Sequence, residues 1–405
     1  MGILIYGGSF NPPHAGHVRS VKRAAEALSP ETIYLIPAAM PPHKTLAPGS
    51  PSPEERLAMT ALAAAEIPGA RAEGIELERA GKSYTSDTLR ALSARHPGQE
   101  LIFLLGTDML LTLPDWHEPE VICSLASIAV FARETDRTQE VEAGAERLRR
   151  EFGARVYVIP GEPVTVSSTE LRKVLKERGG ADRIPDGVYS YIIRKRLYGA
   201  RPDFPWLREK AYAYLKPSRV SHVRGVEEEA LRLAERWGAD SGEAAEAAIC
   251  HDITKALDRE AQLRLCEKYA IMTDEYEKVS EKLLHAKTGA ALAADLYGLS
   301  EDVALAIRFH TTGRPGMSRL EMITYLADYI EPGRNGFDGL PELRRASYED
   351  LDLAMELGMR MSLHEVRGKG YPAHINTVEG QRWYLNSLRR KCLEPVRAAG
   401  IPDRV

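Results

Sequence analysis

Two histidines lie three residues apart directly after a glycine-rich turn near the start of the chain. They are His14 and His17, in the segment Gly7-Gly8-Ser9-Phe10-Asn11-Pro12-Pro13-His14-Ala15-Gly16-His17. Glycines let the backbone approach a polyphosphate closely, and a following helix offers unpaired N–H groups to anions. Imidazoles beside such a turn can donate to phosphate oxygens. The motif therefore predicts phosphoryl or nucleotidyl transfer, in which catalysis is mostly positioning and charge stabilisation.

A second polar segment lies far downstream and reads Val166-Ser167-Ser168-Thr169-Glu170-Leu171-Arg172. Its simplest interpretation is a helix that begins with a capping box formed by Ser167 and Glu170. A capped helix N-terminus beside an arginine is also a phosphate site. The two interpretations are compatible.

The second half of the chain carries histidines and aspartates in the order H…HD…H…H…D. The residues are His222, His251, Asp252, His285, His310 and Asp328. One His-Asp pair alone would be an ordinary helix edge. The whole set on separate helices predicts a metal centre, because imidazole and carboxylate suit Mn, Fe, Co or Zn. His364 and His374 fall outside the pattern and are interpreted as ordinary helix-edge or loop residues.

Short apolar strands alternate with helices in the first half, which predicts a parallel sheet covered on both faces. Ligands bind at the carboxyl ends of such strands, where the first motif lies. The expected strands are 3–6, 32–37, 101–105, 127–131 and 156–159, and the expected helices include 18–28 and 54–65.

The second half predicts an all-helical domain. His222 is expected to precede a helix, and His251-Asp252 to end one, with Lys255 on the same helical face. The expected helices are 227–237, 242–253, 260–269, 278–297, 302–309, 319–330 and 351–367. The expected domains are 1–200 and 207–395, with a linker at 201–206 and a tail at 396–405.

Bulk composition fits a two-domain cytoplasmic protein. Single cores rarely exceed about 300 residues, and this chain has 405. A net charge of −4 gives no sign of nucleic-acid or membrane binding. No stretch approaches the roughly 20 apolar residues of a membrane helix, and no signal peptide is expected. The four cysteines are widely spaced and predict reduced, mostly buried thiols. The oligomeric state stays open, a homo-oligomer included.

The first-half motifs resemble the nucleotidyltransferase superfamily that uses H-x-G-H. More narrowly, they resemble bacterial nicotinate-nucleotide adenylyltransferases over about residues 1–198. The further motifs that carry this likeness are Pro41-Pro42-His43-Lys44, Gly81-Lys82-Ser83-Tyr84-Thr85-Ser86-Asp87-Thr88-Leu89, Gly106-Thr107-Asp108 and Leu113-Pro114-Asp115-Trp116. The resemblance implies a Rossmann-like α/β nucleotidyltransferase domain with a parallel sheet. It would transfer AMP from ATP to nicotinate mononucleotide, giving deamido-NAD and pyrophosphate.

The resemblance also implies roles for individual residues. The catalytic set would be His14, His17, Lys44 and Arg172. ATP would contact Gly7, Gly8, Ser9, Phe10, His14, His17, Gly106, Asp108, Ser167, Ser168, Thr169 and Arg172. Nicotinate mononucleotide would contact Asn11, Lys44, Tyr84, Thr85, Trp116, His117 and Arg133. Mg²⁺ is expected to enter with ATP. The rival interpretation is an adenylyl- or cytidylyltransferase for another small phosphate acceptor.

The second-half pattern resembles HD-domain phosphohydrolases. Arg308-Phe309-His310-Thr311-Thr312-Gly313 and Tyr325-Leu326-Ala327-Asp328-Tyr329-Ile330-Glu331-Pro332-Gly333-Arg334 resemble the YqeK family, which cuts diadenosine tetraphosphate to two ADP. The likeness covers about residues 207–394. It departs at Ala286-Lys287, where the family has Gly-Pro.

This resemblance implies one or two transition metals, iron or manganese. The first would be held by His222, His251, Asp252 and Asp328, and the second completed by His285 and His310. Asp252 would bridge and act in catalysis with Lys255, while Lys255 and Arg334 would bind substrate phosphates. The open alternatives are another nucleotide, such as a guanine alarmone or a deoxynucleotide, or a regulatory or dimerisation module without turnover.

Overall fold

The computed structural model describes residues 2–41, 46–79, 81–132, 138–160, 166–277 and 281–398. The chain forms two compact units, Met1–Asp203 and Phe204–Val405. The expected linker at 201–206 differs from this arrangement, because helix α9 (Phe204–Tyr212) begins within it and buries Trp206. The expected tail at 396–405 overlaps the end of helix α18, and its residues 399–405 lie outside the described ranges.

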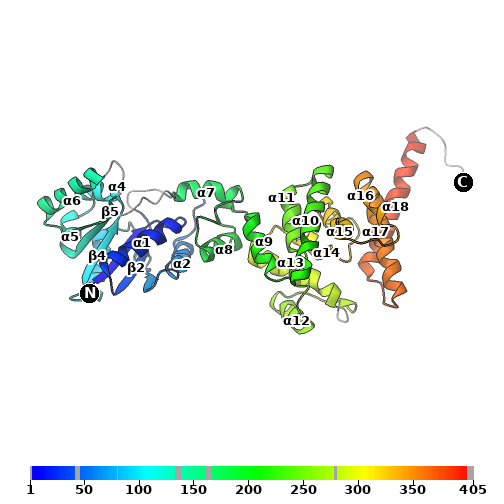
Figure 1. The fold of residues 1–405 in the computed structure, drawn as a ribbon, viewed down its shortest axis with the longest axis horizontal. Coiled ribbons are helices and arrows are strands. Elements are labelled where there is room, and N and C mark those ends of the chain that lie inside the picture. The colour runs from blue at the N-terminus through cyan, green and yellow to red at the C-terminus, as the bar shows by residue number, and fades with distance from the viewer. Residues whose placement is uncertain are drawn as a thin grey trace. The chain divides into compact units, whose positions relative to one another are not determined.

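The described part of the first unit contains a parallel sheet with the strand order β3-β2-β1-β4-β5-β6. Figure 1 labels strands β2, β4 and β5 of this sheet, with the helices of the unit around them. Tyr6, in the central strand, pairs with Leu35 on one side and Leu104 on the other. The strands are β1 (Gly2–Gly8), β2 (Thr32–Pro37), β3 (Ala70–Ala72), β4 (Glu100–Leu105), β5 (Ala126–Ala132) and β6 (Val156–Pro160). Strands β2 and β3 are added on one side of β1, and β4, β5 and β6 are added on its other side. The order of the strands therefore switches between β1 and β4, and the loops after these two strands flank the crevice in which such folds bind ligands.

Helices connect the strands of the first unit and complete its core. Ile3, Ile5 and Phe103 of the central strands are buried in one cluster with residues of the covering helices, such as Leu89. The helices are α1 (Ala15–Leu28), α2 (Pro53–Ala64), α3 (Thr85–Arg95), α4 (Thr107–Thr112), η1 (Leu113–Asp115), α5 (Pro119–Leu125), α6 (Thr138–Phe152), α7 (Ser168–Lys176), α8 (Asp186–Arg194) and η2 (Leu197–Gly199). The α/β class expected from the sequence is confirmed.

Every secondary-structure element in the described part of the second unit is a helix, as expected. After α9 come α10 (Pro217–Trp237), α11 (Ser241–Cys250), α12 (Arg259–Lys268), α13 (Glu281–Tyr297), α14 (Glu301–Phe309), α15 (Arg319–Ile330), α16 (Leu340–Glu349), α17 (Leu351–Gly368) and α18 (Ile375–Ala398). Helices α10, α11, α13, α14 and α15 pack against one another, which brings the histidine-bearing segments together. None of the described helices is long and apolar enough to cross a membrane.

Two expectations about local structure are wrong. His222 lies inside α10, which begins five residues earlier at Pro217. Helix α11 ends at Cys250, so Asp252 and Lys255 lie in the turn that follows it and share no helical face. The described cysteines Cys123, Cys250 and Cys266 are buried free thiols, as expected, and the side chain of Cys392 lies outside the described residues.

Candidate active sites

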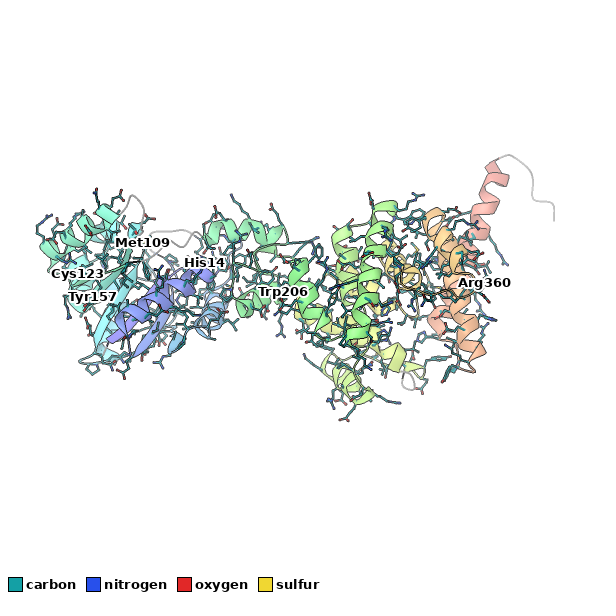
Figure 2. The ribbon with its side chains drawn as sticks, viewed as in Figure 1. His14, Met109, Cys123, Tyr157, Trp206 and Arg360 are labelled. Carbon is teal, nitrogen blue, oxygen red and sulfur yellow. The ribbon has the colours of Figure 1, made fainter. Side chains whose placement is uncertain are left out.

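His14 and His17 cap helix α1 reciprocally. The N–H of His14 donates to Nδ1 of His17 over 3.1 Å, and the N–H of His17 donates to Nδ1 of His14 over 3.4 Å. The two rings stack with their centroids 3.6 Å apart. The expected box at Ser167 and Glu170 is replaced by a simpler cap, in which Ser167 accepts from the N–H of Thr169. Figure 2 locates His14 at the start of α1.

Burial keeps both imidazoles neutral. It lowers the pKa of His14 to about 4, and burial together with the neighbouring His14 lowers the pKa of His17 well below its ordinary value. Because each Nδ1 accepts a backbone hydrogen bond, each neutral ring must carry its proton on Nε2. The pair therefore retains two Nε2–H donors at the end of β1, the group type that phosphate oxygens accept.

The loop between β1 and α1 is held by the downstream Ser-Ser-Thr motif. Arg172 donates to the carbonyl of Asn11 over 2.7 Å, and Ser168 donates to the carbonyl of Pro12 over 3.0 Å. Arg172 also donates to Thr169 over 3.1 Å. The two motifs expected to share a site are thus brought together, although about 160 residues separate them.

Asn11 is buried, and its side chain bonds protein groups. Its amide nitrogen donates to Ser50 over 2.8 Å, and its amide oxygen accepts from the hydroxyl of Tyr198 over 2.8 Å. The expected contact of Asn11 with nicotinate mononucleotide has no support here, because these bonds give the amide a bracing role. Tyr198 therefore ties the end of the first unit to the loop after β1.

Arg56 also holds the loop after β1 in place, and no pattern in the sequence singles it out. The side chain is fully buried, and burial lowers its pKa. Its guanidinium donates to the carbonyls of Ser9, Ala38 and Ala39 over 3.0, 2.6 and 3.0 Å. It thereby joins the loops that follow β1 and β2. An arginine one turn into a helix has no distinctive spacing, so only the structure reveals this role.

The remaining expected residues of the first unit cluster after β3 and β4. Ser83 exchanges two hydrogen bonds with the backbone of Met40, which places the start of α3 beside the loop after β2. The ring of Tyr84 lies 4.3 Å from that of His117. Trp116 packs edge-on against Phe103, with its ring centroid 6.4 Å away, and remains partly exposed.

Other expected residues occupy strand ends or lie outside the described ranges. Gly7 and Gly8 end β1, and the buried Phe10 adopts a left-handed φ of 42° with its ring 5.1 Å from that of His17. Gly106 caps α4, in whose first turn Asp108 is exposed. Lys44 and Arg133 lie outside the described residues.

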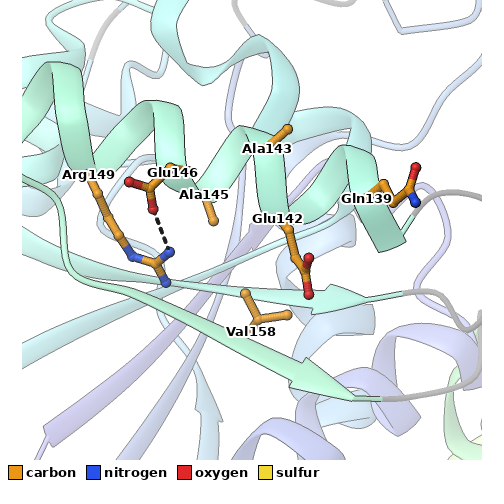
Figure 3. Close-up of a pocket in the computed structure, with 7 residues that line it drawn as sticks. All are labelled: Gln139, Glu142, Ala143, Ala145, Glu146, Arg149 and Val158. Carbon is orange, nitrogen blue, oxygen red and sulfur yellow. Dashed lines mark hydrogen bonds and ion pairs between the residues drawn. The ribbon is translucent and has the colours of Figure 1, made fainter.

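A shallow hollow on the first unit contains none of the expected residues (Figure 3). It lies between α6 and strand β6, and only Val158 contributes from the strand. Arg149 and Glu146 of its wall pair with each other over 3.4 Å. The hollow therefore adds nothing to the site around His14.

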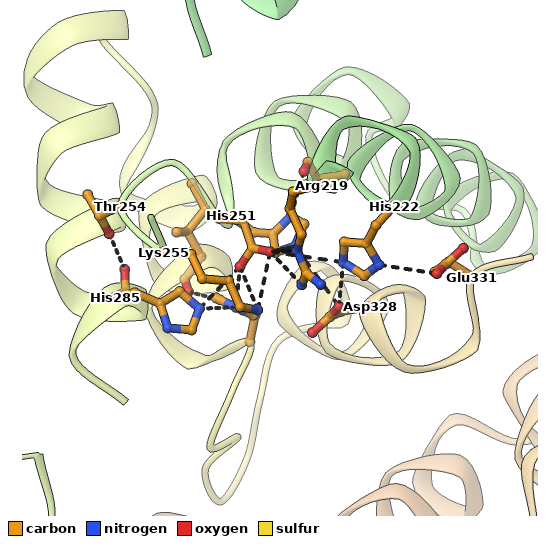
Figure 4. Close-up of polar contacts among 12 residues, drawn as sticks. Arg219, His222, His251, Thr254, Lys255, His285, Asp328 and Glu331 are labelled. Carbon is orange, nitrogen blue, oxygen red and sulfur yellow. Dashed lines mark hydrogen bonds and ion pairs between the residues drawn. The ribbon is translucent and has the colours of Figure 1, made fainter. Parts of the chain in front are cut away.

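In the second unit, the expected histidines and aspartates converge on Asp252. Figure 4 shows His222, His251, His285 and Asp328, which come from different helices and turns, gathered at this centre. Oδ2 of Asp252 lies 3.3 Å from Nε2 of His251 and 4.0 Å from Nε2 of His222. Its Oδ1 lies 3.2 Å from Nε2 of His285 and 3.8 Å from Nε2 of His310. The two oxygens of one buried carboxylate thus face two different pairs of imidazoles. Asp328 closes the set, 3.0 Å from Nε2 of His222.

Three of these histidines are anchored through Nδ1. His251 and His310 donate to the carbonyls of Ala248 and Ile307, each over 2.7 Å. Nδ1 of His222 lies 3.1 Å from Oε1 of Glu331. A neutral ring anchored in this way presents the lone pair of Nε2, which is the form that metals bind.

The donor set fits a divalent cation. The buried Nε2 atoms of His222 and His251 have no hydrogen-bond partner in the described structure. Burial, with the neighbouring His251 and His285, lowers the pKa of His310 to about 3, so that ring is neutral. Two groups of ligand atoms are close enough to share an ion, His222-His251-Asp328 and His251-Asp252-His310.

Three cations border the aspartates. Nζ of Lys255 lies 3.1 Å from Oδ1 of Asp252, and Arg334 donates to Asp328 over 2.9 Å. Arg219, which the sequence interpretation missed, donates to Oδ2 of Asp252 over 2.7 Å. It lies one turn before His222 on α10, so a correct helix start would have placed it in the site.

Glu331 is another residue that the sequence interpretation missed. Its buried carboxylate faces His222, and two glycines make room for it. A Cβ atom on Gly225 would lie 2.5 Å from Oε2 of Glu331, and one on Gly333 would lie 2.9 Å away. Only glycine avoids these contacts. The carboxylate of Glu331 therefore occupies a space between α10 and the loop after α15 that the two glycines leave open.

A separate acid–histidine group, Asp274, Glu277 and His374, is already satisfied. Nδ1 of His374 accepts from the N–H of Asn376, so Nε2 donates its proton to Asp274 over 2.8 Å. Lys287 pairs with Glu277 over 2.6 Å. His374 lies in the loop directly before α18 and outside the metal centre, as expected, and these contacts hold its ring in a buried position.

Both units are similar to known protein families. The family model "Cytidylyltransferase-like" matches residues 5–174, and the model "HD domain" matches residues 219–333. An HD domain implies that the second unit binds a divalent metal. A solved "predicted HD superfamily hydrolase involved in NAD metabolism" from Clostridium acetobutylicum is 36% identical, covering 46% of this chain and 100% of its own, with a TM-score of 0.45.

Two curated relatives extend the likeness. The "Probable nicotinate-nucleotide adenylyltransferase" of Trichlorobacter lovleyi is 38% identical over 49% of this chain and 99% of its own length. The "Probable nicotinate-nucleotide adenylyltransferase/Ap4A hydrolase" of Mycoplasma pneumoniae is 30% identical over 88% of this chain and 98% of its own length. Because this likeness runs through both units, the chain belongs to the nicotinate-nucleotide adenylyltransferase/Ap4A hydrolase family.

Proposed function

We propose that the first unit transfers the adenylyl group of ATP to nicotinate mononucleotide. A phosphate oxygen of the mononucleotide attacks the α-phosphorus of ATP, and the bond to pyrophosphate breaks with its electron pair. The products are deamido-NAD and pyrophosphate. The observation that carries this proposal is the neutral His14–His17 pair on a braced loop at the end of β1, whose donors suit an oxyanion-rich transition state.

The other first-unit residues would bind the two substrates. Lys44 and Arg172 would add positive charge, and Mg²⁺ would enter with ATP. Gly106 and Asp108 would contact the ribose of ATP, while Trp116 would stack on the pyridine ring. The contact between Tyr84 and His117 supports a nicotinate subsite, because it joins the segment of Thr85 to that of Trp116.

Substitution of His17 by alanine tests this proposal. We expect the variant to lose deamido-NAD synthesis, measured by chromatography of the products, and to keep the phosphohydrolase activity of the second unit. Full synthesis by His17→Ala would refute the role of the pair.

We propose that the second unit hydrolyses a nucleotide polyphosphate, diadenosine tetraphosphate to two ADP. A water oxygen bonds to one of the two central phosphorus atoms, and the bond from that atom to the central bridging oxygen breaks, so that the second ADP leaves. A bound metal would polarise the attacked phosphate and lower the pKa of a bound water. Lys255 and Arg334 would contact the phosphates, and His222, His251 and Asp328 would hold the ion.

The two-sided environment of Asp252 supports a second ion completed by His285 and His310, with Asp252 as the bridge. Iron or manganese suits this mixture of imidazole and carboxylate. We expect the purified chain to contain such a metal and Asp252→Ala to lose it, measured by elemental analysis. Retention of full metal content by Asp252→Ala would refute the ligand assignment.

The substrate is tested by incubating the metal-loaded chain with diadenosine tetraphosphate and separating the products by ion exchange. ADP as the sole product would establish symmetric cleavage. Absence of turnover with metal bound would favour another nucleotide, or a module that binds nucleotide without hydrolysing it.

A further inference from the structure

A cavity of about 550 Å³ lies in the second unit, apart from the metal ligands themselves. Its walls come from α17, from the loop between α17 and α18, and from segments adjoining the metal ligands. Its lining includes Tyr276, Thr311, Ser362, Leu363, Val366 and Tyr371. We call this space the α17 cavity.

Three links in the chain connect the walls of the α17 cavity to the segments that carry metal ligands. Thr311 directly follows His310, and Leu283, which also lines the cavity, lies two residues before His285. Ser362 lies close enough to the hydroxyl of Tyr329, the residue after Asp328, to lower the pKa that burial raises there. The segments of His310 and His285 therefore line the cavity, and the segment of Asp328 contacts a residue that lines it.

The lining has the character of a small-molecule site. Leu363 and Val366 supply apolar surface, and Tyr276 and Tyr371 supply aromatic rings on which a base can stack. The buried hydroxyl of Thr311 has no hydrogen-bond partner in the described structure. A volume of 550 Å³ lies within the range of about 300–1,000 Å³ for ligand pockets, which are mostly apolar with a few polar groups that orient the ligand.

We propose that the α17 cavity binds one nucleoside end of the polyphosphate substrate, while the phosphates reach the metal centre. This inference rests on the proposed hydrolase function. The base packs against the apolar and aromatic lining, and the hydroxyl of Thr311 bonds the base or ribose. The cavity would thus provide the recognition of a nucleotide that the metal ligands cannot, since they contact only phosphate and water.

The test fills the cavity without altering a metal ligand. Val366 is half-buried in α17, and Val366→Trp places an indole in the space. We expect the KM for diadenosine tetraphosphate to rise at least about tenfold, with kcat changed less than about threefold. Hydrolysis of bis(p-nitrophenyl) phosphate, which has no nucleoside, should be unchanged. Leu353→Trp, on the exposed surface of the same helix, is the matched control.

An unchanged KM in Val366→Trp would overturn the proposal. If circular dichroism shows that this variant does not fold, Thr311→Val replaces it. That change removes only the unpartnered hydroxyl and should raise the KM about threefold or more. An unchanged KM in Thr311→Val would overturn the proposal equally.

Failure of the proposed function is distinguished by a binding measurement. If the wild-type chain does not hydrolyse diadenosine tetraphosphate, labelled adenosine is dialysed against wild type and Val366→Trp. Both proteins have the same first unit, so any adenosine that it binds contributes equally to the two measurements. One additional equivalent on the wild type supports the cavity as a nucleoside site, and equal binding refutes it.

Discussion

At the scale of single residues, Glu331 has the sharpest consequence in the second unit. It accepts from Nδ1 of His222 and so fixes the ring whose Nε2 faces Asp328. Loss of such a partner typically costs about 10–100-fold in metal affinity. We expect Glu331→Ala to weaken metal binding by this factor, measured by titration calorimetry. Glu331→Gln, which keeps an acceptor oxygen, should restore most of the affinity.

Glu356→Ala is the control for Glu331, because it removes another buried glutamate of the same unit that pairs with Arg360. This control should leave metal affinity unchanged. Gly225→Ala should act like Glu331→Ala, because a Cβ atom there displaces the carboxylate. Equal metal affinity in Glu331→Ala and wild type would show that His222 is oriented by something else.

His14 gives the first unit a defined dependence on pH. Its pKa falls to about 4 in the folded chain, against 6.5 ordinarily, because it is buried. Between these values the unfolded state takes up a proton that the folded state does not, so stability is lost as the pH falls below 6.5. At pH 5 the contribution of His14 to this loss is about 2 kcal/mol.

Hydrogen exchange at the amides of β1 and β4, followed by mass spectrometry at pH 7.5 and 5, measures this loss. Rates must be corrected for their intrinsic dependence on pH. His14→Gln should lose about 2 kcal/mol less stability than wild type over this interval. An identical loss in both proteins would contradict the assignment.

At the scale of elements, Arg56 tests whether α2 sets the shape of the adenylyl-transfer site. Its three bonds to backbone carbonyls join the loops after β1 and β2, and a methionine would leave those carbonyls unpaired. Buried unpaired groups cost about 1–3 kcal/mol each. We expect Arg56→Met to lower kcat/KM for deamido-NAD synthesis at least about tenfold.

Hydrolysis by the second unit should not change in Arg56→Met. Unchanged hydrolysis would show that the substitution affects the first unit locally and does not unfold the whole chain. Arg147→Met, on the exposed face of α6, is the matched control. Normal synthesis by Arg56→Met would show that the two loops keep their shape without this brace.

The sequence predicts the elements in which apolar residues recur regularly. It does not predict those in which polar site residues or charged residues take the apolar positions. Strands β1, β2 and β4 were found because buried parallel strands are continuous apolar runs. The first turns of α10 were missed because Arg219 and His222 occupy the positions that face the centre of the unit. Helices α16 and α18 carry many charged residues, which weakened their apolar pattern.

The same reason explains which site residues were found. Histidines and aspartates in a recognisable order can be predicted as site residues, because these residue types are the ones that bind metals or phosphate. Glu331 and Arg56 could not, because buried partners of this kind are defined by distances between elements. Tyr198 likewise bonds a residue 187 positions away.

At the scale of the molecule, the two units have separate cores and separate sites, so each activity should survive loss of the other. We expect Asp252→Ala to abolish hydrolysis and leave deamido-NAD synthesis within about twofold of wild type. His17→Ala should show the converse. Loss of both activities in either variant would refute independent sites.

The boundary of the first unit makes a final prediction. Tyr198 braces Asn11, and the N–H of Asp203 donates to the hydroxyl of Tyr189 over 2.9 Å, so the last residues before α9 complete this fold. A fragment of residues 1–203 should synthesise deamido-NAD with a kcat/KM within about threefold of the whole chain.

A fragment that stops at residue 196 should lose at least about 2 kcal/mol of stability and most of its activity, because the buried amide of Asn11 loses a partner. Full-length Tyr198→Phe isolates the hydroxyl from the rest of the deleted segment. If the shorter fragment and Tyr198→Phe both kept full activity, the loop after β1 would be held without its C-terminal brace, and α2 and α7 alone would position the histidine pair.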